Sequence, residues 1–180
     1  SRHLNNNRFV KAVFDGWQLS GTTALVSGQP AGIGFSTTDG QNITGGGDGA
    51  RVVMLRSPEL ADKKEGVNAN GSLGTIQWID PTAFGRPALG TTGNAPKDVF
   101  RLPGINNWDM SFFKNFPFFS EKVKLQFRWE IYNLFNHTQF NGVDTSAQFD
   151  ANGVQIKESF GRVTSARSPR VMQGSLRLTF

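Results

Sequence analysis

Four segments of the chain alternate apolar and polar residues at every second position, which is typical of β-strands with one apolar face. The clearest segment runs over 122–134, and the others run over 17–27, 107–116 and 171–180. Pro117 cannot donate to a strand ladder, so it predicts a break and a short hairpin before the next strand. The pattern therefore predicts an all-β fold, an antiparallel meander of about four long strands.

The phase of the alternation assigns the side chains to two faces of the sheet. The apolar face is predicted to contain Trp17, Leu19, Leu25, Trp108, Met110, Phe112, Val123, Leu125, Phe127, Trp129, Ile131, Met172, Leu176, Leu178 and Phe180. The opposite, mostly polar face is predicted to contain Gln18, Ser20, Asp109, Lys124, Gln126, Arg128, Glu130, Gln173 and Arg177. A slip of one residue would exchange the two sets, so the register is strongly specified.

Two long segments separate the strands. One, 28–104, lies between the first two strands, and the other, 136–169, lies between the last two. The tract 37–50 is rich in Gly, Thr, Asn and Asp and is predicted to be loop. Within the first segment, 51–55 and 75–79 are apolar enough for short strands. We expect both segments to be long loops.

The residues before the first strand follow a different period. Phe9, Val10, Val13 and Phe14 are spaced as on one or two helical turns. Because this run is short, we treat residues 1–16 as a turn segment that precedes the strands.

Alternation alone fits a soluble β-sandwich as well as a membrane β-barrel. Strand length favours the barrel: the runs span about ten to thirteen residues, whereas soluble strands centre on about five or six and tilted membrane strands need about nine to eleven. Aromatic residues also gather at one predicted rim, namely Trp17, Phe116, Phe118, Phe119 and Phe180. We therefore expect the apolar face to be lipid-facing and the polar face to be lumen-facing.

Composition argues against most catalytic chemistries. The chain has no Cys, which excludes thiolate catalysis and disulfides, and its two histidines, His3 and His137, stand apart from any metal-binding motif. The Gly-rich run 45–49 lacks the Lys-Ser/Thr of a phosphate-binding loop. The net charge of +5 is not clustered with stacking aromatics, as nucleic-acid binding requires. We expect no enzyme activity, no cofactor, no metal site and no nucleic-acid partner.

Several motifs, in this order, resemble the C-terminal part of TonB-dependent outer-membrane receptors, most of all the Oar-like group that carries an N-terminal carboxypeptidase-regulatory-like domain. The motifs are GWQLSGTTALVSGQP, WIDPTAF, LPGINNWDMSFFKNF, LQFRWEIYNLFNHTQF and FGRVTSARSPRVMQGSLRLTF. The resemblance covers most of the chain from Trp17 to Phe180. It implies a barrel of about 22 strands with a plug in its lumen and energised uptake of a bulky nutrient across the outer membrane of a Gram-negative-type bacterium.

The resemblance also implies partners and an orientation. It makes 1–16 a periplasmic turn segment and places 28–104 and 136–169 outside the cell. TonB would be engaged through an N-terminal region, with the plug, that is missing from this chain. Leu176, Leu178 and Phe180 match the C-terminal signal that the barrel-assembly machinery reads.

Some alternatives stay open. Near the external end of the last strand, Lys157, Arg162, Arg167 and Arg170 would bind phosphates of the outer-leaflet glycolipid or would simply form a solvated charged loop. A secreted β-sandwich that binds carbohydrate would use four stacking platforms, Trp17, Trp78, Trp108 and Trp129. A structural barrel or adhesin without TonB coupling is a third possibility. Four strands cannot close a barrel, because the smallest use about eight, so we expect an open, curved sheet.

Overall fold

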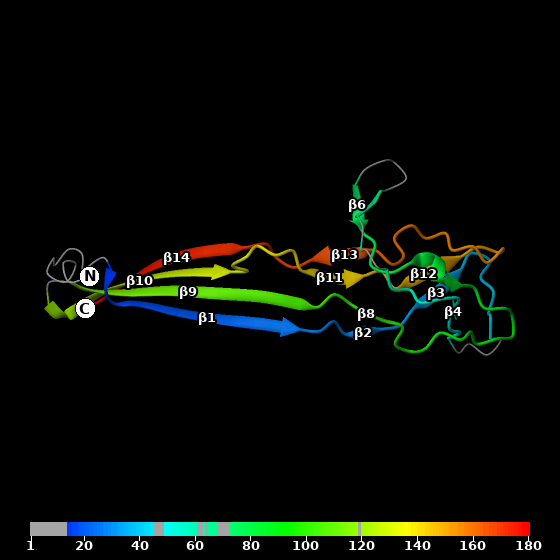
Figure 1. Cartoon of the computed structure of the whole chain (residues 1–180), viewed down its shortest axis with the longest axis horizontal. Helices are drawn as coiled ribbons and strands as arrows, with labels where there is room; N and C mark the ends of the chain where they lie inside the picture. Colours follow the sequence, from blue (N-terminus) through cyan, green and yellow to red (C-terminus); the bar gives the residue numbers. More distant parts are fainter. Residues whose placement is uncertain (1–13, 45–48, 61–62, 64, 68–72, 119) are drawn as a thin grey trace. The chain divides into compact units, whose positions relative to one another are not determined.

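The computed structural model describes residues 14–44, 49–60, 63, 65–67, 73–118 and 120–180. The chain divides into two compact units. The sheet unit comprises 1–26, 105–138 and 168–180, and the loop unit comprises 27–104 and 139–167. Each unit therefore draws on segments that are far apart in the sequence (Figure 1).

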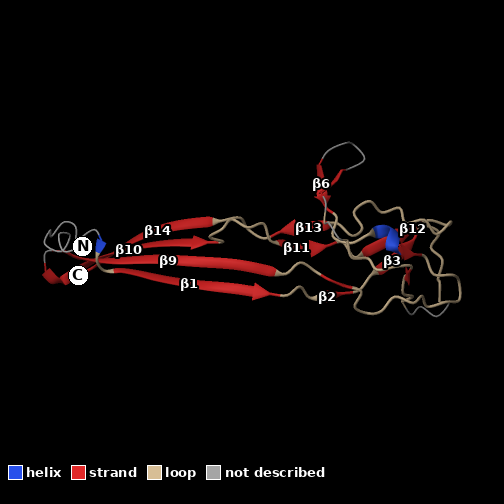
Figure 2. Ribbon diagram, in the orientation of Figure 1, coloured by secondary structure: helices blue, strands red, loops and turns tan. Residues whose placement is uncertain are grey.

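The sheet unit is built on four antiparallel strands in the order β1-β9-β10-β14 (Figure 2). They are β1 (Trp17–Val26), β9 (Ile105–Phe118), β10 (Ser120–Tyr132) and β14 (Val171–Thr179). This confirms the predicted all-β antiparallel meander. Within the described residues, β1 and β14 are the two edges, so the sheet is open.

Apolar residues of neighbouring strands lie opposite one another at several positions of the register. Trp129 of β10 lies opposite Phe112 of β9 on one side and Gly174 of β14 on the other. Phe127 likewise lies opposite Leu176. Because successive residues of a strand point to opposite faces, these pairings place whole rows of apolar side chains on the same face of all four strands.

The predicted break at Pro117 is wrong. Strand β9 continues through Pro117 to Phe118, and Pro117 lies opposite Lys124 of β10. The ladder is irregular just beyond this pair, where the register shifts between Ser120 and Lys124. A proline is tolerated where the ladder is already interrupted, since its missing N–H then costs no regular hydrogen bond.

The loop unit contains ten short strands and one 3-10 helix within its described residues. The strands are β2 (Pro30–Ala31), β3 (Gly34–Thr37), β4 (Val53–Met54), β5 (Glu65–Val67), β6 (Leu73–Ile76), β7 (Phe84–Gly85), β8 (Phe100–Arg101), β11 (Phe140–Val143), β12 (Ser146–Phe149) and β13 (Val163–Ala166), and the helix is η2 (Pro81–Ala83). They form two-stranded pairs, of which β3 with β12 is parallel and joins the two sequence segments. The short strands expected within 51–55 and 75–79 correspond to β4 and the end of β6.

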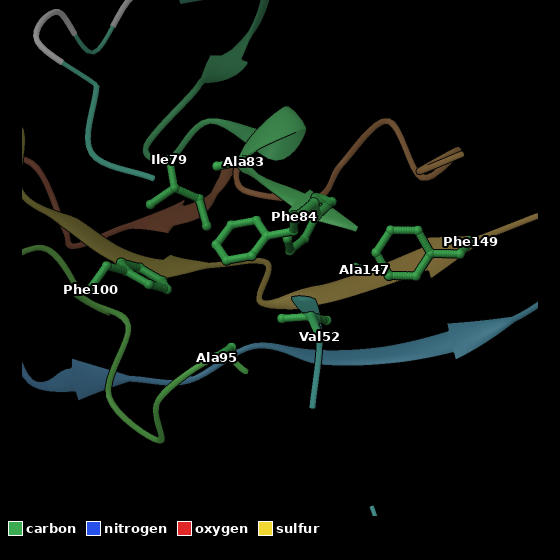
Figure 3. Packing of buried hydrophobic residues seen from close by; sticks show 9 residues of the cluster. Val52, Ile79, Ala83, Phe84, Ala95, Phe100, Ala147 and Phe149 are labelled. Atoms are coloured by element: carbon green, nitrogen blue, oxygen red, sulfur yellow. The ribbon is translucent and has the colours of Figure 1, made fainter. Parts of the chain in front are cut away.

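A hydrophobic core lies inside the loop unit (Figure 3). Its buried members are Val52, Ile79, Ala83, Phe84, Ala95, Phe100, Ala147, Phe149 and Phe160. The last three come from 139–167 and the others from 27–104. The two segments that we expected to be separate long loops therefore fold together around one core. The expected helical turns over Phe9–Phe14 lie almost wholly outside the described residues.

Candidate functional site

The apolar face of the sheet is uncovered within the described chain. Wherever the register assigns a partner, the residues predicted for the apolar face share one face and those predicted for the polar face share the other. Leu19, Leu25, Leu176 and Leu178 of the apolar face are each more than half exposed, at 65%, 69%, 69% and 56%. A contiguous apolar surface of this kind marks contact with a membrane or another protein.

Aromatic side chains contact one another toward both ends of this face. Near the β9–β10 hairpin, the ring of Trp17 meets Phe127 edge-on at 6.2 Å, and Phe127 stacks near Trp129 at 6.4 Å between centroids. Toward the other strand ends, Trp108 meets Phe135 edge-on at 5.8 Å. Aromatic girdles at both interfaces are typical of membrane β-barrels.

The aromatic rim predicted from the sequence lies at one end of the sheet. The register places Trp17 opposite Lys114 and Phe116 opposite Leu125, close to the β9–β10 hairpin, and the chain ends with Phe180 at the same end of the sheet (Figure 1). Phe119 and the side chain of Phe118 lie outside what the structure describes.

Lys114 is a residue of the apolar face that the sequence reasoning missed. It lies opposite Trp17 and Phe127, and it is only 2% exposed. Its Nζ donates to the carbonyl oxygen of Asp15 at 3.0 Å and lies 5.0 Å and 5.1 Å from the ring centroids of Trp17 and Phe116. The aromatic rings shield the cation while its tip reaches backbone at the strand end. The two-residue alternation of β9 extends to position 114, so it could have assigned Lys114 to the apolar face.

The polar face carries hydrogen bonds that cross the strands. Along β10, Arg128 Nε lies 2.9 Å from Glu130 Oε1, and across the strands Glu130 Oε2 accepts a hydrogen bond from Gln173 of β14. Gln126 Nε2 donates to Asn115 Oδ1 of β9 at 3.1 Å. Such cross-strand pairs stabilise a polar barrel wall. That this wall faces a lumen stays a prediction.

An asparagine-based turn ends β10. Asn133 and Asn136 have φ values of 54° and 50°, a left-handed conformation that Asn tolerates better than most residues. The Asn133 side chain accepts from the backbone N–H of His137 and donates to its carbonyl, both at 3.0 Å. Asn136 Oδ1 accepts from the backbone N–H of Arg170 at 3.0 Å. The turn thus fixes the end of β10 to the chain entering β14.

Several ion pairs join side chains within the loop unit. Arg86 donates to Asp39 Oδ2 at 2.8 Å and to the carbonyl of Asp150 at 2.9 Å, and its side chain is only 10% exposed. This contact links the segment 27–104 to the segment 139–167. Another pair joins Lys157 Nζ to Asp144 Oδ2 at 2.7 Å. Pairs that are largely shielded from water contribute more than exposed surface pairs.

The carboxylate of Asp144 has several partners within the loop unit. Besides Lys157, it accepts from Ser159 Oγ at 2.6 Å and from the backbone N–H of Ser146 at 3.0 Å. Burial raises the pKa of the Asp144 carboxyl, but the hydrogen bonds from Lys157, Ser159 and Ser146 and the charge of Lys157 outweigh it. Its pKa therefore lies below the usual value.

The four basic residues that would bind glycolipid or form a solvated charged loop belong to different units. Lys157, Arg162 and Arg167 lie in the loop unit, and Arg170 lies in the sheet unit. Lys157 is paired with Asp144, and Arg170 NH1 donates to the carbonyl of Leu134 at 3.4 Å. Glycolipid binding by these residues stays a prediction.

The described residues contain no group of three or more His, Asp or Glu side chains arranged to hold a metal ion. No helix among the described residues is both long and apolar enough to cross a membrane.

A meander of long antiparallel strands with one uncovered apolar face, aromatic residues toward both ends and long connecting segments defines the class of transmembrane β-barrels. The family model described as "Outer membrane beta barrel domain" matches residues 1–173. The chain therefore belongs to this family and is an outer-membrane β-barrel protein. Comparison with curated proteins and with solved structures gave no match.

Proposed function

We propose that the chain is the C-terminal part of a TonB-dependent outer-membrane receptor of the Oar-like group. The observation that carries this proposal is the asymmetry of the connections in the sheet unit. Strands β9 and β10 are joined by a tight hairpin, whereas 27–104 and 133–170 connect the other neighbouring strands. Barrels of the outer membrane have short periplasmic turns and long external loops. The loop unit is then the external part and the hairpin the periplasmic part.

In this proposal the two faces of the sheet have different neighbours. The apolar face contacts lipid. Transfer of each exposed Leu or Phe side chain from water to lipid would stabilise the inserted barrel by about 1.5–3 kcal/mol. The polar face, with Arg128, Glu130 and Gln173, lines the lumen and contacts the plug. The edge strands β1 and β14 pair with the rest of the barrel, because an unpaired edge in lipid leaves backbone groups unsatisfied.

The chain is proposed to take part in uptake without catalysis. Three carboxylates of the loop unit, Asp39, Asp80 and Asp144, each form an ion pair with a nearby cation. A carboxylate held in this way maintains the fold of a loop and is a poor general base, since its pKa is lowered.

The positions of the tryptophans do not support the alternative of a secreted β-sandwich that binds carbohydrate. Trp17, Trp108 and Trp129 lie on the apolar face of one open sheet, and only Trp78 of the four tryptophans lies in the loop unit. A barrel without TonB coupling, as in an adhesin, is the competing candidate. It would have the same four strands and the same folded loop unit but would need no energy source.

The test is uptake by cells that produce the complete protein. The substrate is a fluorescently labelled fraction of nutrients from the culture medium. We expect cells to accumulate it only when both the protein and TonB are present, and accumulation should stop when the proton gradient is dissipated. A tonB deletion that leaves accumulation unchanged would contradict the proposal. Adhesion without accumulation would favour the adhesin.

The proposed assembly signal is tested separately. The side chains of Leu176, Leu178 and Phe180 are 69%, 56% and 95% exposed, which leaves them accessible to the barrel-assembly machinery. We expect Phe180→Ala to lower the amount of folded, heat-modifiable protein in the outer membrane. Thr179→Ala, on the opposite face, is the matched control. Equal amounts of folded protein for the two variants would argue against a role of Phe180.

A further inference from the structure

A cavity of about 290 Å³ lies beside Trp78 in the loop unit. Its floor belongs to the hydrophobic core, because Ile79 and Phe100 are 1% and 6% exposed. The complete lining is Glu59, Leu60, Lys63, Trp78, Ile79, Phe100, Arg101 and Leu102. An apolar floor with a few charged groups at the rim is the usual composition of a small-molecule site.

One wall of the cavity is held in place by an ion pair behind it. Arg56 NH2 lies 2.7 Å from Asp80 Oδ2, and the backbone N–H of Asp80 donates to the carbonyl of Pro58 at 2.9 Å. Glu59 forms a β-bridge with Ile79. The segment that carries Glu59 is therefore fixed against the floor before any ligand arrives.

Trp78 and Arg101, which also line the cavity, are held in place by hydrogen bonds. The indole Nε1 donates to the carbonyl of Arg101 at 2.8 Å, and Arg101 NH1 donates to the carbonyl of Gly28 at 3.0 Å. The backbone N–H of Leu102 donates to the carbonyl of Gln29 at 2.9 Å. The cavity is thus preorganised, which reduces the entropy lost on binding.

The charge at the rim favours an anion. Lys63 and Arg101 contribute two positive charges and Glu59 one negative charge. Lys63 Nζ lies 3.4 Å from the ring centroid of Trp78, and an ammonium on an aromatic face still has N–H groups directed away from the ring. Burial lowers the pKa of Lys63, and the charge of Glu59 acts in the opposite direction. Pairing with an anion would restore part of the solvation that this ammonium has lost.

We propose that this cavity binds a small carboxylate that carries an apolar ring. Lys63 and Arg101 hold the carboxylate by charge-assisted hydrogen bonds, and Trp78 and Phe100 contact the ring. The volume suits one ring with a short side chain, since ligand sites begin at about 300 Å³. The inference rests on the proposed receptor function for its biological meaning, but binding itself needs no TonB.

The first experiment titrates phenylacetate into the complete protein, purified in detergent, and follows binding by calorimetry. Phenylacetamide is the neutral isostere, and acetate is the anion without a ring. We expect phenylacetate to bind at least about tenfold more tightly than either control, because only phenylacetate uses both the charged rim and the apolar floor. Equal affinity for phenylacetate and phenylacetamide, or no binding of phenylacetate, overturns the proposal.

The second experiment compares two lysine variants. Lys63→Met keeps the apolar stem beside Trp78 but removes the charge, and we expect about tenfold weaker binding of phenylacetate. Lys97→Met removes an exposed lysine that does not line the cavity and is expected to leave the affinity unchanged. Hydrogen exchange of the loop unit confirms that both variants fold. Equal weakening by the two variants overturns the proposed site.

The two proposals fail in different ways. If phenylacetate binds as expected but uptake does not depend on TonB, the receptor proposal fails and the cavity stands. If uptake depends on TonB but phenylacetate does not bind, the cavity proposal fails and the receptor proposal stands.

Discussion

The two units of the chain differ in how far their apolar side chains are exposed. In the sheet unit, Leu19 and Leu176 remain 65% and 69% exposed, whereas in the loop unit Val52 and Phe149 are fully buried at 0%. Within the described residues, nothing covers these apolar side chains of the sheet. The loop unit buries its own. The stability of the first unit therefore depends on its environment, and that of the second depends on its internal packing.

The units also differ in what holds them in register. Strict alternation fixes the strands of the sheet unit, since any slip would exchange two chemically distinct faces. The loop unit relies on contacts between distant segments: β3 pairs with β12, and Trp78 donates its backbone N–H to Gly161 at 2.8 Å. Such non-local contacts stabilise a fold only when all of its segments are in place.

The largest expected effect is the loss of the loop core. Phe149 is fully buried and meets Phe35 edge-on at 5.8 Å, so Phe149→Ala removes a core contact between the two segments. We expect a loss of about 3–5 kcal/mol in the stability of the loop unit. Hydrogen exchange should rise across 27–104 and 139–167 while the sheet strands stay protected. Equal loss of protection in β9 and β10 would show that the units are not independent.

A charge on the apolar face tests the sheet unit in the same way. Leu176→Arg places a cation among residues that are proposed to meet lipid, and we expect a loss of about 2–4 kcal/mol in vesicles. Ser175→Arg, one residue away on the polar face, should cost about 0–1 kcal/mol. Denaturant titration of the complete barrel in vesicles measures both. If the two variants lose the same stability, the assignment of the faces is wrong.

A glycine at the junction of the two loop segments gives a smaller effect. Gly161 has a φ of +77°, and a Cβ there would lie 2.9 Å from the carbonyl oxygen of Ile79. We expect Gly161→Ala to cost about 1–3 kcal/mol through backbone strain and crowding. Gly34→Ala is the control, because a Cβ at Gly34 meets nothing within 4 Å. Thermal unfolding of the loop unit should separate the two variants.

The smallest predicted effect is a pH dependence confined to the loop unit. The folded-state pKa of Asp144 lies below its unfolded value of about 3.9. The carboxylate therefore contributes stability that is fully present above the unfolded pKa and is lost as the pH falls through the folded pKa. Asp144→Asn should remove about 1 kcal/mol at neutral pH and flatten this acid dependence. An unchanged acid profile of Asp144→Asn would refute the assignment.

The strands of the sheet unit were predictable because their signal is local. Each strand repeats the same two-residue period for nine or more residues, and the pairing then follows from chain order. The error at Pro117 has a local cause too: a missing donor argues against a regular ladder, but it does not argue against an irregular strand end. Lys114 was missed because a charged residue is not expected on an apolar face, although the two-residue alternation of β9 assigns it to that face.

The loop unit could not be predicted in the same way. Its core residues sit on strands of two to four residues or between strands, so no period marks them. Pairing of 34–37 with 146–149 joins segments on either side of two long strands, a contact that a single sequence does not reveal. Residues from separate parts of 27–104 line the cavity beside Trp78. The sequence suggested Trp78 as a stacking platform only for the alternative of a β-sandwich, and the roles proposed for Lys63 and Arg101 follow only from their positions.

The most direct test of the contrast between the two units is quenching of tryptophan fluorescence by lipids brominated on their acyl chains. Two single-tryptophan variants of the complete barrel in vesicles are compared, one that keeps Trp129 on the apolar face and one that keeps Trp78 in the loop unit, with Phe at the other tryptophan positions. We predict strong quenching of Trp129 and none of Trp78. Equal quenching of both, or quenching of Trp78 alone, would contradict the account.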